Sequence, residues 1–91
     1  YADWCVECKH LEKQTFAHAE VAPRLAGLRL LRADVTESSA EDRALLEHYG
    51  LFGPPAVLFF DEGRELREHR ITGLVAAAEF NGHLDRLAAA R

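Results

Sequence analysis

The sequence contains only two cysteines, no long apolar run and no excess of basic residues. Two cysteines are too few for the multiple disulfides that hold small secreted proteins together. The longest apolar stretch, residues 56–60, is far shorter than the roughly 18 to 20 residues that cross a bilayer. The net charge of -4, with acidic and basic residues interspersed, provides no basic stripe for phosphate. We therefore expect no membrane contact by this chain and no nucleic-acid partner.

The residues that are present fit one globular domain. A chain of 91 residues can bury one hydrophobic core but not two, so we expect a single domain over residues 1–91. A content of 48% hydrophobic and 29% charged residues is ordinary for a folded protein. The sequence has no basic start followed by an apolar segment, so it shows no secretory signal. Because Tyr1 lies only four positions before Cys5, we interpret the chain as part of a longer protein.

The first third of the chain predicts a helix, a short turn and a strand. Residues 5–16 contain good helix formers without glycine or proline, which predicts a helix that begins at or near Cys5. Residues 18–26 contain a proline and are followed by Gly27, which favours a short irregular helical turn. The partial alternation of residues 28–35 predicts a strand that is buried on at least one face.

A second helix is predicted over residues 40–49. Ser38 and Glu41 form a capping-box pattern before an apolar stripe, and Gly50 fits the end of the helix.

The last third predicts a hairpin and a helix. The apolar residues 56–60 are typical of an interior strand, residues 61–64 of a turn, and residues 65–72 of a second strand. Residues 76–90 have the apolar spacing of an amphipathic helix. The element order predicts an α/β fold with a central mixed β-sheet flanked by helices. A helix that carries a cysteine pair at its start normally follows a strand, so we expect the central strand to lie upstream of this chain.

Cys5 and Cys8 are spaced so that both reach the first turn of the predicted helix. The positive end of a helix and its unpaired N–H groups stabilise a thiolate, lowering a cysteine pKa from its usual value of about 8.5. We therefore expect Cys5 to be the exposed nucleophile that attacks a partner disulfide. Cys8, one turn deeper, would then release the partner by attacking the mixed disulfide. Neither step requires a cofactor or a metal.

A single C-x-x-C motif is a weak signal, because it also occurs in zinc sites and in structural disulfides. Zinc needs two further ligands, yet there is no third cysteine and the histidines show no paired spacing. Trp4 beside the pair and the position at a helix start favour redox reactivity over a structural bridge. A non-catalytic interaction module that uses the same two cysteines remains an alternative.

Pro55 and Glu12 are the other candidate site residues. X-Pro bonds can be cis, and Pro54-Pro55 comes directly before a predicted strand, although such a pair is more often an ordinary trans loop. Glu12 lies on the same predicted helix face as the two cysteines. A buried carboxylate there would disfavour the Cys5 thiolate, and a protonated one could supply a proton to Cys8. A solvated glutamate beside a lysine is an equally good interpretation.

The motif over residues 1–9, YADWCVECK, resembles the C-terminal periplasmic domain of DsbD. The resemblance continues through residues 12–13, 15–16, 33–36, 45–46, 53–55, 58–61 and 72–73, so it covers essentially the whole chain. It implies a thioredoxin-like fold, a redox-active Cys5/Cys8 pair, a cis proline at Pro55 and Glu12 as an acid that tunes the pair.

The resemblance also implies partners and a location. A DsbD-like domain would be periplasmic, would take electrons from a membrane-embedded domain of the same polypeptide and would pass them to an N-terminal periplasmic domain. That relay would supply disulfide isomerases and cytochrome c maturation. The expected partners are thus protein disulfides and dithiols, and we expect a monomer. A free-standing thioredoxin-like reductase is the alternative within the same chemistry.

Two positions depart from the family pattern. Glu7 adds a negative charge between the cysteines where a small residue is common, and Pro54-Pro55-Ala56 replaces the more usual apolar-Pro-Thr. A second acid that the family carries lies upstream of Tyr1 and outside this chain.

Overall fold

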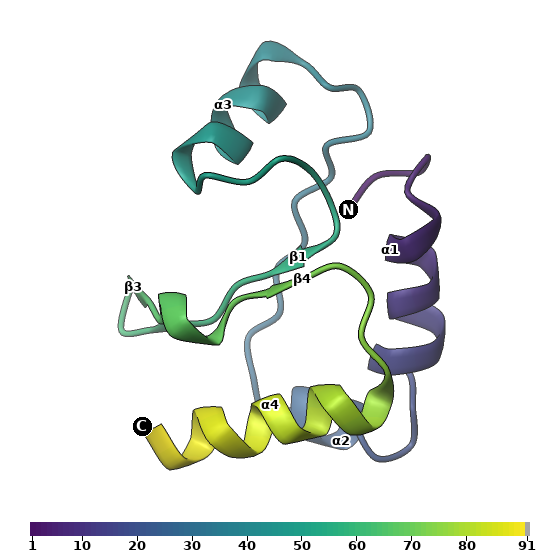
Figure 1. The fold of residues 1–91 in the computed structure, drawn as a ribbon, viewed down its shortest axis with the longest axis vertical. Coiled ribbons are helices and arrows are strands. Elements are labelled where there is room, and N and C mark those ends of the chain that lie inside the picture. Colours follow the sequence, from purple (N-terminus) through teal and green to yellow (C-terminus); the bar gives the residue numbers. More distant parts are fainter. Residues whose placement is uncertain (91) are drawn as a thin grey trace.

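The computed structural model describes residues 1–90 and contains short strands between helices (Figure 1). The helices are α1 (Val6–His10), the π-helix η1 (Leu11–Phe16), α2 (Ala22–Leu25), α3 (Ala40–His48), the 3-10 helix η2 (Arg67–His69) and α4 (Ala77–Ala90). The strands are β1 (Ala56–Val57), β2 (Phe60–Asp61), β3 (Arg64–Glu65) and β4 (Ile71–Thr72). No helix in this part of the chain has the length and apolar character needed to cross a bilayer.

The helix predicted over residues 5–16 is present, but it changes type halfway. Cys5 is the N-cap of α1, and η1 follows directly from Leu11. We call the two together the N-terminal helix (residues 6–16). Its buried face carries Cys8, Leu11 and Thr15. Wider π-helical turns often occur at functional sites, and this one begins just before Glu12.

The strands form two separate antiparallel pairs instead of one central mixed sheet. β1 pairs with β4, with Ala56 opposite Thr72. β2 pairs with β3 through a two-residue turn, Glu62-Gly63, whose φ values of 52° and 80° suit a tight hairpin. Figure 1 shows the β1–β4 pair near the middle of the molecule, between α3 and α4. The predicted second strand over residues 65–72 is interrupted by η2.

The strand predicted over residues 28–35 is not formed, and this expectation was wrong. A strand needs a ladder of hydrogen bonds. Among residues 1–90, the backbone of this segment has strand-like bonds only with Tyr1, whose nitrogen donates to the Ala33 carbonyl at 3.0 Å and whose carbonyl accepts from Val35 at 2.8 Å. This alternation is the pattern of one parallel bridge. The apolar segment 56–60 is also less interior than expected, since only Phe59 is buried.

The capping box of α3 lies one residue later than expected. Ser39 is the N-cap, and its side chain accepts from the Asp42 N–H while the Asp42 carboxylate accepts from the Ser39 N–H. Ser38 instead adopts a left-handed conformation with φ of 50°. The prediction of Gly50 as the stop is confirmed: its φ is 67°, and its N–H donates to the Glu47 carbonyl at 3.0 Å.

The main hydrophobic core lies between α4, the N-terminal helix and the β1–β4 pair. Phe80 of α4 is 1% exposed and packs edge-on against Phe16, with ring centroids 5.2 Å apart. A second, smaller cluster contains Ala2, Val35 and the two cysteines. The N-terminal helix therefore contacts the main core through Leu11 and the smaller cluster through Cys8.

Candidate active site

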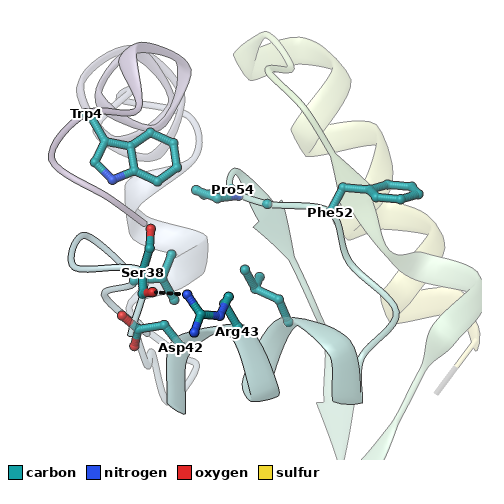
Figure 2. Close-up of a pocket in the computed structure, with 9 residues that line it drawn as sticks. Trp4, Ser38, Asp42, Arg43, Phe52 and Pro54 are labelled. Carbon is teal, nitrogen blue, oxygen red and sulfur yellow. Dashed lines mark hydrogen bonds between the residues drawn. The ribbon is translucent and has the colours of Figure 1, made fainter. Parts of the chain in front are cut away.

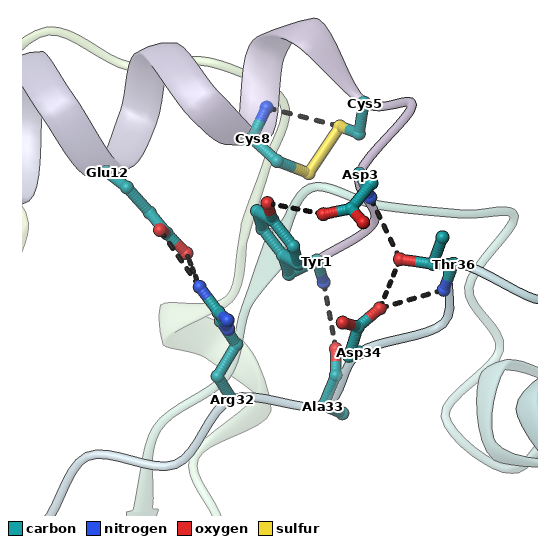
Figure 3. Close-up of a disulfide and its surroundings, with 9 residues drawn as sticks. All are labelled: Tyr1, Asp3, Cys5, Cys8, Glu12, Arg32, Ala33, Asp34 and Thr36. Atoms are coloured by element: carbon teal, nitrogen blue, oxygen red, sulfur yellow. Dashed lines mark hydrogen bonds and ion pairs between the residues drawn. A yellow bond between two sulfur atoms is a disulfide. The ribbon is translucent and has the colours of Figure 1, made fainter.

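Cys5 and Cys8 form a disulfide at the start of α1, with Cα atoms 5.2 Å apart (Figure 3). The backbone N–H of Cys8 donates to the Cys5 sulfur at 3.1 Å. Since Cys5 is the N-cap, its sulfur occupies the position where a side chain accepts a hydrogen bond from the first helical turn. A Cys5 thiolate in the reduced protein would gain from the same donor.

The expectation of an exposed Cys5 needs correction. Cys5 is 7% exposed and Cys8 is 3% exposed, because the disulfide places the sulfurs against each other and Ala2 and Val35 pack around them. The larger of the two exposed fractions belongs to Cys5.

Thr36 holds the segment that leads into the disulfide. Its hydroxyl oxygen accepts from the Asp3 N–H at 2.9 Å, and its carbonyl accepts from the Trp4 indole N–H at 2.9 Å. The Thr36 hydroxyl and N–H both donate to Asp34, and these bonds hold the pKa of the Asp34 carboxyl below its usual range. Sequence reasoning assigned no role to Thr36 or Asp34, since Thr36 is 32 and 33 positions from Trp4 and Asp3, the residues that it holds, and Asp34 acts through Thr36.

Glu12 is turned towards Arg32 in Figure 3, and both of its oxygens accept from Arg32 Nη1 at 3.0 and 3.1 Å. The Arg32 guanidinium also lies over the Tyr1 ring, 4.1 Å from its centroid. The Tyr1 hydroxyl donates to Asp3 at 2.9 Å, and this bond raises the pKa of the phenol. Glu12 is thus joined through Arg32 and Tyr1 to the residue two positions before Cys5.

The Pro54–Pro55 peptide bond is cis, which confirms that prediction. Pro54 and Trp4 lie on opposite sides of a hollow with a volume of about 190 Å³ (Figure 2). Trp4 is 57% exposed, and Phe52, on the loop between α3 and β1, is completely exposed with its ring directed away from this hollow. Large apolar side chains at the surface near a reactive group are typical of protein-binding faces.

A second hollow, of about 450 Å³, lies on the other side of the same loop. It is lined by Glu7, Pro55 and Arg70 together with residues 50–54 and 72–73. Arg70 donates to the Tyr49 carbonyl at 2.8 Å and to both oxygens of Glu65, so it joins the hairpin to the end of α3. Glu7, which we noted as a departure from the family pattern, therefore lines this hollow together with Pro55.

The described residues contain no group of three or more histidine, cysteine, aspartate or glutamate side chains that could hold a metal ion. Both cysteines, the usual zinc ligands, are bonded to each other.

Comparison with known proteins gives a consistent result. A family model described as thioredoxin-like matches residues 1–62. The thiol:disulfide interchange protein DsbD of Haemophilus ducreyi is 48% identical over 88 residues, which cover 96% of this chain and 15% of that protein. DsbD of Klebsiella pneumoniae is 51% identical over 85 residues, covering 92% of this chain and 14% of that protein. The chain therefore spans about one seventh of the length of these curated relatives.

A solved structure resembles the fold closely. The C-terminal domain of Neisseria meningitidis DsbD in its oxidised form superposes with a TM-score of 0.81 at 36% identity, covering 94% of this chain and 73% of that one. Its reduced form gives a TM-score of 0.77 at the same identity.

Proposed function

Because this chain belongs to the family of thioredoxin-like DsbD C-terminal domains, we propose that it is a thiol:disulfide oxidoreductase domain whose Cys5–Cys8 pair cycles between disulfide and dithiol. The observation that supports this proposal most directly is the disulfide at the helix start, where the Cys8 N–H contacts the Cys5 sulfur. The surface apolar residues Trp4 and Phe52 beside it suit a protein substrate.

Reduction of a partner would proceed in two exchanges. The Cys5 thiolate attacks one sulfur of the partner disulfide, forms a mixed disulfide and releases the other partner sulfur as a thiolate, which takes up a proton. Cys8, after losing its proton, then attacks Cys5 and releases the first partner sulfur. The Cys5–Cys8 bond forms, two electrons have passed to the partner, and the reverse sequence reloads the domain.

We further propose the relay that the family suggests. The domain would be periplasmic and would pass electrons from a membrane-embedded domain of the same polypeptide to an N-terminal periplasmic domain. The 48% identity to Haemophilus ducreyi DsbD over 88 residues supports this relay. Pro55, Trp4 and Glu12 would serve the site as a docking element, an apolar contact and a tuning acid. Transmembrane segments upstream in the full reading frame would favour this relay over a free-standing reductase.

Trapping the mixed disulfide tests the exchange chemistry. A Cys8→Ser variant, reduced and mixed with the oxidised N-terminal domain of its own polypeptide, should accumulate a covalent complex through Cys5, because the resolving thiol is absent. Non-reducing electrophoresis and mass spectrometry of the linked peptides measure it. Cys5→Ser is the matched control and should trap little. Equal trapping by the two variants, or none by Cys8→Ser, would remove the proposal.

A further inference from the structure

Arg32 places a positive charge beside the one acidic side chain that we have proposed to tune the cysteines. It lies on the extended segment 28–35 rather than on the N-terminal helix, 20 residues from Glu12 in sequence. Nothing in the sequence pattern singled it out. In the structure it holds both Glu12 oxygens and stacks on Tyr1 at the same time.

The contribution of this ion pair to folding is small. The side chains of Arg32 and Glu12 are 55% and 36% exposed, and pairs this accessible contribute little to stability because water and salt screen them. Its effect on a neighbouring charge can be larger. Glu12 lies about one helical turn beyond Cys8 and about two beyond Cys5, close enough for an unpaired carboxylate to oppose a thiolate.

We propose that Arg32 is a positioning residue for the redox pair: it holds the Glu12 carboxylate in an ion pair that offsets its negative charge, so that Glu12 opposes the Cys5 thiolate less. This inference rests on the proposed function of Cys5. Figure 3 draws Asp3 and Tyr1 before the disulfide, Glu12 on the N-terminal helix, and Arg32 and Asp34 on the adjacent segment. Helix α1 also carries Glu7 in its first turn and Lys9 in its last.

The other acids drawn in Figure 3 also accept hydrogen bonds. Asp3 accepts from the Tyr1 hydroxyl, and Asp34 accepts from the Thr36 hydroxyl and N–H. Neither carboxylate is paired with an arginine in these bonds, whereas Glu12 is. Removal of Arg32 would therefore leave a new uncompensated negative charge at Glu12.

The test measures the pKa of Cys5 from the pH dependence of its alkylation rate by iodoacetamide. All variants carry Cys8→Ser, so that only one thiol reacts, and the ionic strength is low. Arg32→Gln should raise the Cys5 pKa by roughly 0.5 to 1, the effect expected of one unit charge about 10 Å away in a partly solvated site. Arg32→Lys, which keeps the charge, should restore most of the difference. Arg29→Gln, an exposed arginine of the same segment, is the matched control and should cause no change.

A double variant decides whether Arg32 acts through Glu12. In a Glu12→Gln background, Arg32→Gln should raise the Cys5 pKa by less than it does when Glu12 is present, because no carboxylate is then left unpaired. An unchanged Cys5 pKa in Arg32→Gln, or an identical change in both backgrounds, would overturn the proposal. Should Arg32→Gln not fold, Glu12→Gln alone should lower the Cys5 pKa, and no change would be equally decisive.

These results separate the two proposals. If Cys5 still forms mixed disulfides while its pKa is indifferent to Arg32, the exchange function stands and only the role of Arg32 fails. If Cys5 forms no mixed disulfide in any variant, the proposed function itself fails.

Discussion

Thr15 carries a buried hydroxyl on the inner face of the N-terminal helix. It is 2% exposed, and its Oγ1 donates to the Val75 carbonyl at 2.6 Å. Val75 comes just before α4, so this one bond ties the helix that carries the cysteines to the segment entering the last helix. A buried carbonyl that loses its donor costs more than the bond itself contributes, because the carbonyl is then desolvated without a partner.

Thr15→Val should therefore lower the free energy of unfolding by about 1–3 kcal/mol, even though the two side chains have nearly the same shape. Urea denaturation followed by circular dichroism measures the difference. Thr15→Ser keeps the hydroxyl and is the matched control, with a smaller loss that reflects only the missing methyl group. A loss as large for Ser as for Val would show that the methyl packing, and not the hydrogen bond, matters at this position.

Among the elements, the β2–β3 hairpin is joined to the end of α3 by Arg70. Its guanidinium donates to both oxygens of Glu65 on β3 and to the carbonyl of Tyr49. The hydrogen bonds that Arg70 donates to the Glu65 carboxylate hold the pKa of Glu65 below its usual range and raise the pKa of Arg70. The contacts of Arg70 thus position the start of the loop that continues to Pro55.

This pair predicts a specific pH dependence of stability. Because the folded-state pKa of Glu65 is lowered, its contribution is complete above the ordinary glutamate pKa of about 4.3 and is lost as the pH falls through the lower folded value. Wild type should thus exceed Glu65→Gln in unfolding free energy at pH 6, and the two should converge below about pH 4. Denaturant midpoints at a series of pH values measure this. Glu68→Gln, at an exposed position of η2, should match wild type in unfolding free energy at every pH. A gap between wild type and Glu65→Gln that stays constant with pH would contradict the explanation.

The elements also show how far sequence reasoning reaches. Local signals were sufficient for the N-terminal helix, α3, the Glu62-Gly63 hairpin turn and α4, because caps, glycines and apolar spacing act over a few residues. The segment 28–35 was mispredicted as a strand because a strand depends on partners elsewhere in the chain, and here the only strand-like bonds come from Tyr1. The α3 cap was one residue off because Ser38 and Ser39 both precede an acid by three positions.

In the candidate site, the same division holds. The cysteine spacing and the cis proline could be predicted from the motif and the resemblance. The contacts of Thr36 with Trp4 and of Arg32 with Glu12 could not, since they join segments about 20 to 30 residues apart whose approach depends on the whole fold. Glu12 was found by helical spacing, but the interpretation that gave it a basic neighbour considered a lysine close in sequence and not Arg32.

At the scale of the whole molecule, the apolar side chains that remain exposed are informative. Trp4 and Phe52 both line the hollow of about 190 Å³, whereas Phe60, which is 50% exposed, lies on the β2–β3 hairpin. Figure 1 shows that hairpin on the opposite side of the β1–β4 pair from α1. A partner that brings its own disulfide to Cys5 must cover the first surface and need not touch the second.

Phe52→Ser should therefore slow exchange with a protein partner and leave exchange with a small thiol unchanged. An exposed aromatic side chain that becomes buried at an interface contributes enough for a loss of about three- to tenfold in rate when it is truncated. Stopped-flow Trp4 fluorescence during oxidation of the reduced domain by the proposed N-terminal partner domain, and separately during reduction of the oxidised domain by dithiothreitol, measures both rates. Phe60→Ser, the same change on the distant surface, should leave both rates as in wild type. Equal slowing with dithiothreitol would mean that Phe52 affects the disulfide itself, and an unchanged protein rate would mean that partners approach Cys5 from another side.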